Sequence, residues 1–232
     1  MKAMLLRVGI DKGTDGALAP IFSNGSFEYI PLSEKNSKTI EKRTFETTLG
    51  NNGLPFSKYL PDKIKKRKLH FDPEFETYTY GDQTSKRNYL LKLEKTDYLV
   101  FYAGLTPFEN SDYEEALYII GYFEVEEVID FSKLNPNEQM QSIKLYKNNS
   151  HIKSEGFEKL VIIKGYVKTS KLLDKAVLLS KRKLNKIGRN YHAVSPEMVD
   201  LLGISGSIQR SIPPRFVTAN NFENLKNLLN IE

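Results

Sequence analysis

The fold centres on two apolar stretches, Tyr98-Leu99-Val100-Phe101-Tyr102-Ala103 (98–103) and Leu117-Tyr118-Ile119-Ile120-Gly121-Tyr122-Phe123-Glu124-Val125 (117–125). Continuous runs of this kind predict β-strands that are buried on both faces of a sheet. Gly121 predicts a bulge or close packing against a neighbouring strand. A similar run, Leu160-Val161-Ile162-Ile163-Lys164-Gly165-Tyr166-Val167, predicts a further strand.

An earlier apolar stretch, Met4-Leu5-Leu6-Arg7-Val8-Gly9-Ile10, predicts an N-terminal strand that contains a charge. A buried charge is costly unless it is paired and hydrogen-bonded. We therefore expect Arg7 to be buried and held by a carboxylate, either Asp11 or Asp82. The alternative is an edge strand in which Arg7 faces water.

The remaining elements follow from turn and capping signals. Asn24-Gly25 between apolar runs predicts a tight hairpin turn. Ser195 and Pro196 predict the start of a helix that ends at Gly203. Further helices are expected around 37–47, near Thr84, over 132–147 and from Asn220 onward. The sequence predicts an α+β fold in a single domain, 1–232, in which residues 170–232 can form a helical subregion.

Composition limits the class of protein. The 232-residue chain has no cysteine, no tryptophan and no apolar run of the ~18 residues that a membrane helix needs. The first residues lack the layout of a signal peptide. We therefore expect a cytoplasmic protein without disulfides or a membrane partner.

Charge is distributed unevenly along the chain. Residues 109–130 hold eight acidic residues and no basic residue, whereas residues 164–189 hold nine basic residues and one acidic residue. The basic segment predicts salt-sensitive contacts with nucleic acid. The alternatives are a solvated surface and a scaffold for protein partners. The residues expected to contact nucleic acid are Lys181, Arg182, Lys183, Lys186 and Arg189.

Several blocks of sequence resemble the family called nucleotide modification associated domain, type three. The first runs Leu5-Leu6-Arg7-Val8-Gly9-Ile10-Asp11-Lys12-Gly13 and continues through Gly16-Ala17-Leu18-Ala19-Pro20-Ile21-Phe22 and Ser26-Phe27-Glu28-Tyr29-Ile30-Pro31. The later blocks are 70–75, 79–82, 99–105 and 118–123. The resemblance covers nearly the whole chain, and it implies a role in a DNA base modification system.

A second, weaker resemblance concerns shape. Residues 97–102 and 119–125 are similar to the core of PUA-like barrels, especially EVE-type domains, which bind a flipped or modified base among aromatic side chains. This chain has Thr96-Asp97 where a Gly-Asp turn is usual, and it lacks tryptophan. Tyr80 and Tyr102 would then stack on the base. The expected fold class is thus α+β, with a mixed curved sheet or a PUA-like β-barrel and peripheral helices.

Four residues are candidates for catalysis: Asp11, His70, Asp72 and Asp82. Carboxylates and imidazoles bind divalent metals or act as acids and bases. The His70-x-Asp72 spacing places two such groups on one side of an extended segment. Ordinary loop hydrogen bonds explain the same spacing, so we assign no metal, and the cofactor stays unknown.

Two loops are candidates for ligand binding. Backbone N–H groups of the loop containing Gly13 and Gly16 could hold a phosphate, although a plain turn explains its glycines equally. The loop 205–215 carries Gln209, Arg210 and Arg215 and no acid, so it could clamp a phosphate or merely cover the core. His151 and His192 are interpreted as isolated loop residues.

The expected function is that of a nucleotide- or DNA-directed protein that recognises or processes a base, which can be a modified one. An enzyme requires at least two of the acidic and imidazole groups in one cleft. A non-enzymatic reader of modified bases requires an aromatic pocket without them, so both remain open beside the scaffold. We expect the 11–16 loop and the 70–82 segment to form adjoining walls of one cleft.

Overall fold

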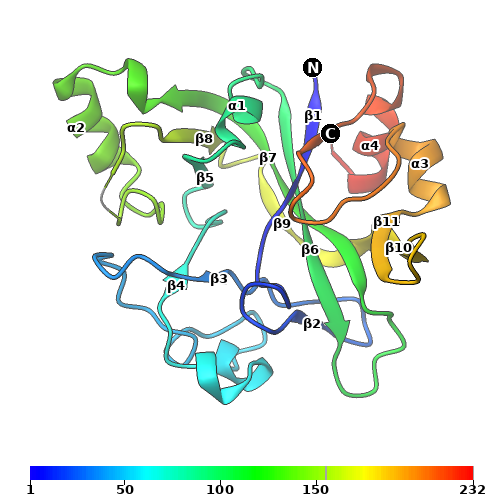
Figure 1. The fold of residues 1–232 in the computed structure, drawn as a ribbon. Helices are drawn as coiled ribbons and strands as arrows, with labels where there is room; N and C mark the ends of the chain where they lie inside the picture. Colours follow the sequence, from blue (N-terminus) through cyan, green and yellow to red (C-terminus); the bar gives the residue numbers. More distant parts are fainter. Residues whose placement is uncertain (155, 232) are drawn as a thin grey trace.

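A mixed β-sheet forms the centre of the molecule in the computed structural model, which describes residues 1–154 and 156–231 (Figure 1). The order of the main path is β12-β1-β6-β7-β8-β5, while β2 also pairs with β6 and β9 with β7. The bounds of these strands are β1 Ala3–Arg7, β2 Ala19–Ile21, β5 Thr79–Asp82, β6 Tyr98–Pro107, β7 Ala116–Asp130, β8 Val161–Gly165, β9 Lys171–Leu178 and β12 Arg215–Phe216. Two small ribbons pair β3 (Leu32–Ser33) with β4 (Leu69–His70) and β10 (Ser180–Leu184) with β11 (Asn190–Val194).

The sheet is open. Its path runs from β12 to β5, and the described residues form no closed barrel. The α+β class agrees with this architecture, but the expected PUA-like barrel is not found. β1 and β2 run parallel to β6, whereas β7 is antiparallel to β6, β8 and β9. The register between β6 and β7 shifts beside Gly121, which confirms the irregularity expected there.

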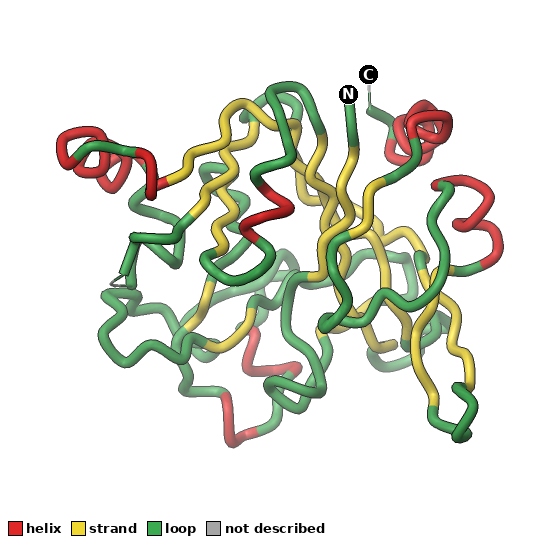
Figure 2. Tube along the Cα trace, turned by 45° about the horizontal axis from the view of Figure 1, so that its top comes forward, coloured by secondary structure: helices red, strands yellow, loops and turns green. Residues whose placement is uncertain are grey.

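Both faces of the sheet are buried, as the continuous apolar runs predict. Alternate residues of β6 point to opposite sides. Leu99 and Phe101 join a core that includes Phe45 and other residues of the N-terminal loops. Val100 joins a second core that includes residues of α3 (Pro196–Leu202) and α4 (Phe222–Leu229). Figure 2 shows the helices at the periphery of the strands.

The capping signals at Ser195 and Gly203 predict the ends of α3 correctly. α3 begins after Ser195, whose side chain accepts a hydrogen bond from the N–H of Met198, and ends at left-handed Gly203. The turn at Asn24-Gly25 also forms, because the N–H of Gly25 donates to the Phe22 carbonyl. The other α-helices are α1 Arg87–Leu90 and α2 Pro136–Leu145.

Two expectations about helices were wrong. No helix forms over 37–47, where Asn36, Thr39 and Glu41 instead accept hydrogen bonds from backbone N–H groups two residues ahead. Such local side-chain bonds compete with helix formation. The segment 170–232 is not mainly helical, because β9, β10, β11 and β12 lie within it and its first strand pairs with β7.

None of the helices in the described part of the chain combines the length and apolar character needed to cross a membrane.

Candidate functional site

Arg7 lies at the end of β1 and is buried, with 8% of its surface exposed. Its guanidinium packs on Gly104 of β6, where a Cβ atom would lie 2.7 Å from Arg7 Nη2. The Arg7 side chain makes no ion pair or hydrogen bond with residues 1–154 and 156–231, and its Nε is a buried donor without a partner. Burial, and then the charge of Arg210, lower the pKa of Arg7 to about 10, against the opposing effects of Tyr102 and Asp11.

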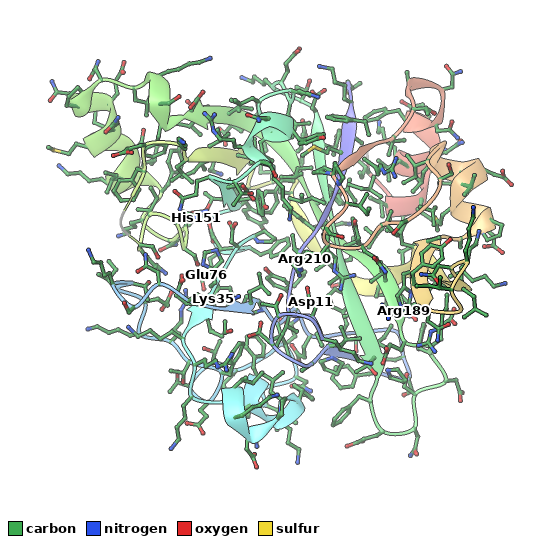
Figure 3. The ribbon with its side chains drawn as sticks, viewed as in Figure 1. Asp11, Lys35, Glu76, His151, Arg189 and Arg210 are labelled. Atoms are coloured by element: carbon green, nitrogen blue, oxygen red, sulfur yellow. The ribbon has the colours of Figure 1, made fainter. Side chains whose placement is uncertain are left out.

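Asp11, a carboxylate expected to hold Arg7, forms its ion pair with Arg210 instead. Arg210 Nε donates to Asp11 Oδ2, and its Nη2 donates to the backbone carbonyls of Val8 and Gly9. Figure 3 shows Asp11 and Arg210 together at the centre of the molecule. The expectation of a buried Arg7 is therefore confirmed. The expectation that a carboxylate holds Arg7 is wrong, because Asp11 is paired with Arg210.

The 11–16 loop is a turn built on Asp11. Asp11 Oδ1 accepts a hydrogen bond from the N–H of Thr14 at 2.8 Å, and the Asp11 carbonyl accepts from the N–H groups of Asp15 and Gly16. Three of the N–H groups that could have held a phosphate are thus already bonded. The interpretation of this loop as a phosphate cradle is not supported.

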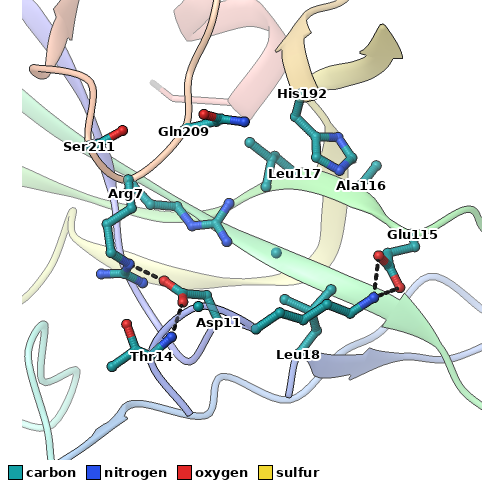
Figure 4. A pocket seen from close by; sticks show the side chains of 14 residues that line it. Arg7, Asp11, Thr14, Leu18, Glu115, Ala116, Leu117, His192, Gln209 and Ser211 are labelled. Carbon is teal, nitrogen blue, oxygen red and sulfur yellow. Dashed lines mark hydrogen bonds and ion pairs between the residues drawn. The ribbon is translucent and has the colours of Figure 1, made fainter. Parts of the chain in front are cut away.

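Two cavities adjoin Arg7. The larger one has a volume of about 560 Å³ (Figure 4). Its polar lining residues include Arg7, Arg210 and Gln209. Leu18 and Leu117 add apolar surface, and Lys12 pairs with Glu115 at 2.6 Å. The remaining lining residues are Asp11, Gly13, Thr14, Gly104, Ala116, His192 and Ser211.

A smaller cavity of about 120 Å³ shares Arg7 and Arg210 with the larger one. It also contains the candidates from the 70–82 segment. The lining residues are Arg7, Val8, Gly9, Leu32, His70, Asp72, Tyr80, Asp82, Lys86, His151 and Arg210. Instead of one cleft, two cavities meet at the two arginines, and Asp11 lies in the larger while Asp72 and Asp82 lie in the smaller.

Two histidines lie side by side in the smaller cavity. The rings of His70 and His151 are 4.8 Å apart between centroids. His151 Nε2 lies 3.3 Å from Asp72 Oδ2, and His70 Nδ1 lies 2.7 Å from Glu34 Oε2. Burial lowers the pKa of His151, but the hydrogen bond and charge of Asp72, helped by other carboxylates, raise it above its ordinary value.

Burial also acts on two neighbouring groups. Burial raises the pKa of Glu34, but hydrogen bonds from His70 and backbone N–H groups outweigh it and lower the value to about 2. Burial, and then the charge of Arg210, lower the pKa of Lys86. Lys86 and Glu34 were not singled out from the sequence, because neither stands in a motif.

Three sequence candidates for ligand binding lie outside the two cavities: Gly16, Tyr102 and Arg215. Tyr102 belongs to the second core, and its hydroxyl donates to the Ile208 carbonyl at 3.0 Å. Gly16 and Arg215 line neither cavity. Tyr80 lines the smaller cavity, but the residue is only 4% exposed and its ring packs against Phe101. Neither tyrosine has a free face for stacking on a base.

The five basic residues expected to contact nucleic acid lie on or beside the β10–β11 ribbon. All five are exposed: Lys181, Arg182, Lys183, Lys186 and Arg189. Arg182 Nη2 lies 3.7 Å from Glu115 Oε1, which lines the larger cavity. The ribbon also contributes His192 to that cavity, and its Nδ1 contacts Ser180 Oγ at 3.1 Å. Burial, and then the charges of Arg182 and Arg7, lower the pKa of His192.

Comparison with known proteins supports the resemblance found in the sequence. No match was found among curated proteins or among solved structures. The model of one family, nucleotide modification associated domain 3, matches residues 2–195. The match ends before α3 and does not include Arg210. The chain belongs to the nucleotide modification associated domain 3 family.

Proposed function

We propose that this protein binds a nucleotide of a DNA strand in the larger cavity, as part of a nucleotide modification system. Membership of the family supports the general role. The observation that carries the specific proposal is Arg7, a buried guanidinium without a protein partner that lines this cavity. A bound phosphate would supply the missing counter-charge, and guanidinium groups suit phosphate oxygens.

The size and chemistry of the cavity fit a nucleotide. A volume of about 560 Å³ lies within the range typical of small-molecule sites. Leu18 and Leu117 offer apolar surface for a sugar or base, while the Gln209 amide can both donate and accept hydrogen bonds. Among the described residues, the lining includes no tyrosine or phenylalanine, which argues against an aromatic reader pocket at this place.

The basic ribbon provides a path for the rest of the strand. Lys181, Lys183, Lys186 and Arg189 are exposed and make no ion pair within the described structure, so their charges are available to phosphates. Because the same ribbon contributes His192 to the cavity, a strand lying along it would have one nucleotide within reach of Arg7.

Binding to labelled single-stranded and duplex DNA, followed by fluorescence anisotropy, tests the proposal. Titration of the four deoxynucleoside monophosphates by calorimetry tests the cavity alone. We expect Arg7→Met to weaken both kinds of binding by at least ~tenfold, since removing a buried charged contact costs about 2–5 kcal/mol. Arg215→Met is the matched control, because Arg215 lies on β12 outside both cavities. This variant should bind DNA and nucleotides as the wild type does.

Salt dependence tests the ribbon separately. A plot of the logarithm of the DNA association constant against the logarithm of the salt concentration has a negative slope. Changing Lys181, Arg182 and Lys183 to Glu should make this slope less steep by ~3, because each lost phosphate contact removes about 0.9. Three exposed lysines elsewhere, Lys35, Lys58 and Lys133, changed to Glu provide a control of equal charge. The proposal fails if DNA does not bind at low salt, or if both triple variants lose the same affinity.

A further inference from the structure

We propose that His70, Asp72 and His151 form a binding site for one late first-row divalent cation, of the zinc or ferrous type. One ligand atom from each of the three side chains lies within 4.8 Å of the others. Two imidazoles and one carboxylate are the donors that such ions prefer, whereas magnesium and calcium favour sites made of oxygen. The ion itself can be tested without any nucleotide, so the inference does not depend on the proposed function.

Each ligand is oriented by a second residue. Glu34 Oε2 accepts from His70 Nδ1 at 2.7 Å, which leaves His70 Nε2 as the ligand atom. That Nε2 has no hydrogen-bond partner in the part of the chain described. A carboxylate behind a metal-binding imidazole is the usual arrangement, because it fixes the tautomer and the direction of the ring.

Asp72 is held in a similar way. Its Oδ1 accepts from the N–H of Gly81 at 2.8 Å and from Asn149 Nδ2 at 3.3 Å. The other oxygen, Oδ2, faces His151 at 3.3 Å. The carboxylate thus has one oxygen fixed by the protein and one directed at the imidazole.

The loop that carries His151 is built into the fold. Asn149 is fully buried, and its Oδ1 accepts from the N–H of His151 at 2.9 Å. Gly81 leaves room for the ring, because a Cβ atom there would lie 2.8 Å from His151 Cδ2. Position and orientation of this imidazole are therefore determined by buried contacts.

The geometry requires only a small contraction to bind an ion. Ligands at about 2.1 Å from a tetrahedral centre lie about 3.4 Å apart, so a separation of up to 4.8 Å must close by at most ~1.4 Å. The carboxylates of Glu34, Asp72 and Asp82 face three cations around the cavity, Arg7, Lys86 and Arg210, and Arg210 is itself paired with Asp11. Three protein ligands leave a coordination position for water or an anionic oxygen.

Metal binding by the intact protein tests the proposal directly. After treatment with a chelator, the protein is titrated with Zn²⁺, Co²⁺, Mg²⁺ and, without oxygen, Fe²⁺, while calorimetry and Co²⁺ absorption record binding. We expect one ion per chain for zinc, cobalt and iron, and no comparable affinity for magnesium. Zinc affinity should fall at least ~100-fold in His70→Gln and His151→Gln, and ~10–100-fold in Glu34→Gln. His192→Gln, the remaining histidine of the chain, is the matched control and should bind normally.

Histidine NMR signals of the unaltered protein keep the test valid if a variant fails to fold. The chain has three histidines, and Zn²⁺ should shift the imidazole signals of His70 and His151 together at one equivalent. No saturable binding, equal loss in His192→Gln, or a first shift at His192 would overturn the proposal. Magnesium binding as tight as zinc would overturn the assignment of the ion class.

Discussion

Replacing Arg7 with methionine should stabilise the fold while it weakens nucleotide binding. The Arg7 side chain is buried on Gly104 with no partner for its Nε in the described structure. Burial lowers the pKa of Arg7 well below its ordinary value, to about 10. Since one unit corresponds to about 1.4 kcal/mol, the charged group loses roughly 3 kcal/mol in the folded chain relative to water.

Methionine is apolar and nearly as long, so it removes this cost and keeps most of the contact with β6. Some packing of the arginine stem is lost, and we expect a net gain of ~1–2 kcal/mol in the free energy of unfolding. For a chain of this size, that gain raises Tm by ~2–8 °C. The gain should be constant below pH 10 and shrink above it, because folded Arg7 then gives up its proton while the unfolded chain keeps it.

Urea unfolding and thermal melting of Arg7→Met, beside wild type, measure this effect. Arg215→Met is again the control, since an exposed arginine should change stability by less than ~0.5 kcal/mol. A variant that is less stable than both wild type and the control would refute the reasoning. Such a result would mean that the surrounding structure already compensates the charge of Arg7.

Three other substitutions have effects that can be measured by unfolding. Asp11→Asn should destabilise by ~1–3 kcal/mol, the opposite sign to Arg7→Met, because it leaves a partly buried guanidinium without its counter-charge; an unchanged Tm would contradict this. Burial raises the pKa of Glu41, but hydrogen bonds from Arg43 and Lys153 outweigh it and lower the value to about 2. The stability that Glu41 contributes is therefore complete above about pH 4.5 and lost as pH falls toward 2; a gap between Glu41→Gln and wild type that does not narrow over this range would disprove the pairing. Ser195→Ala should cost ~1 kcal/mol by removing the N-cap of α3, and urea midpoints would show no loss if the cap were dispensable.

Local sequence patterns are enough to predict the central buried strands, the ends of α3 and the family. Apolar runs at 98–103, 117–125 and 160–167 specify strands buried on both faces, because burial of alternate residues on both sides leaves no polar positions. Ser195 and Gly203 specify the ends of α3 because capping depends on neighbouring residues only. The helix expected over 37–47 does not form, because side chains in this segment accept hydrogen bonds from nearby backbone N–H groups.

The residues of the candidate site come together only through contacts between segments that are distant in sequence. Arg210 reaches Asp11 because β12 brings the end of the chain to β1. His151 reaches Asp72 because β5 pairs with β8, which joins two segments far apart in sequence. Nothing near His151 in sequence distinguishes it from an ordinary loop histidine, since Asp72 and His70 come from a distant segment of the chain. Periodicity and capping act between near neighbours and are visible in the sequence, whereas ion pairs and shared cavities depend on the order of strands in the sheet.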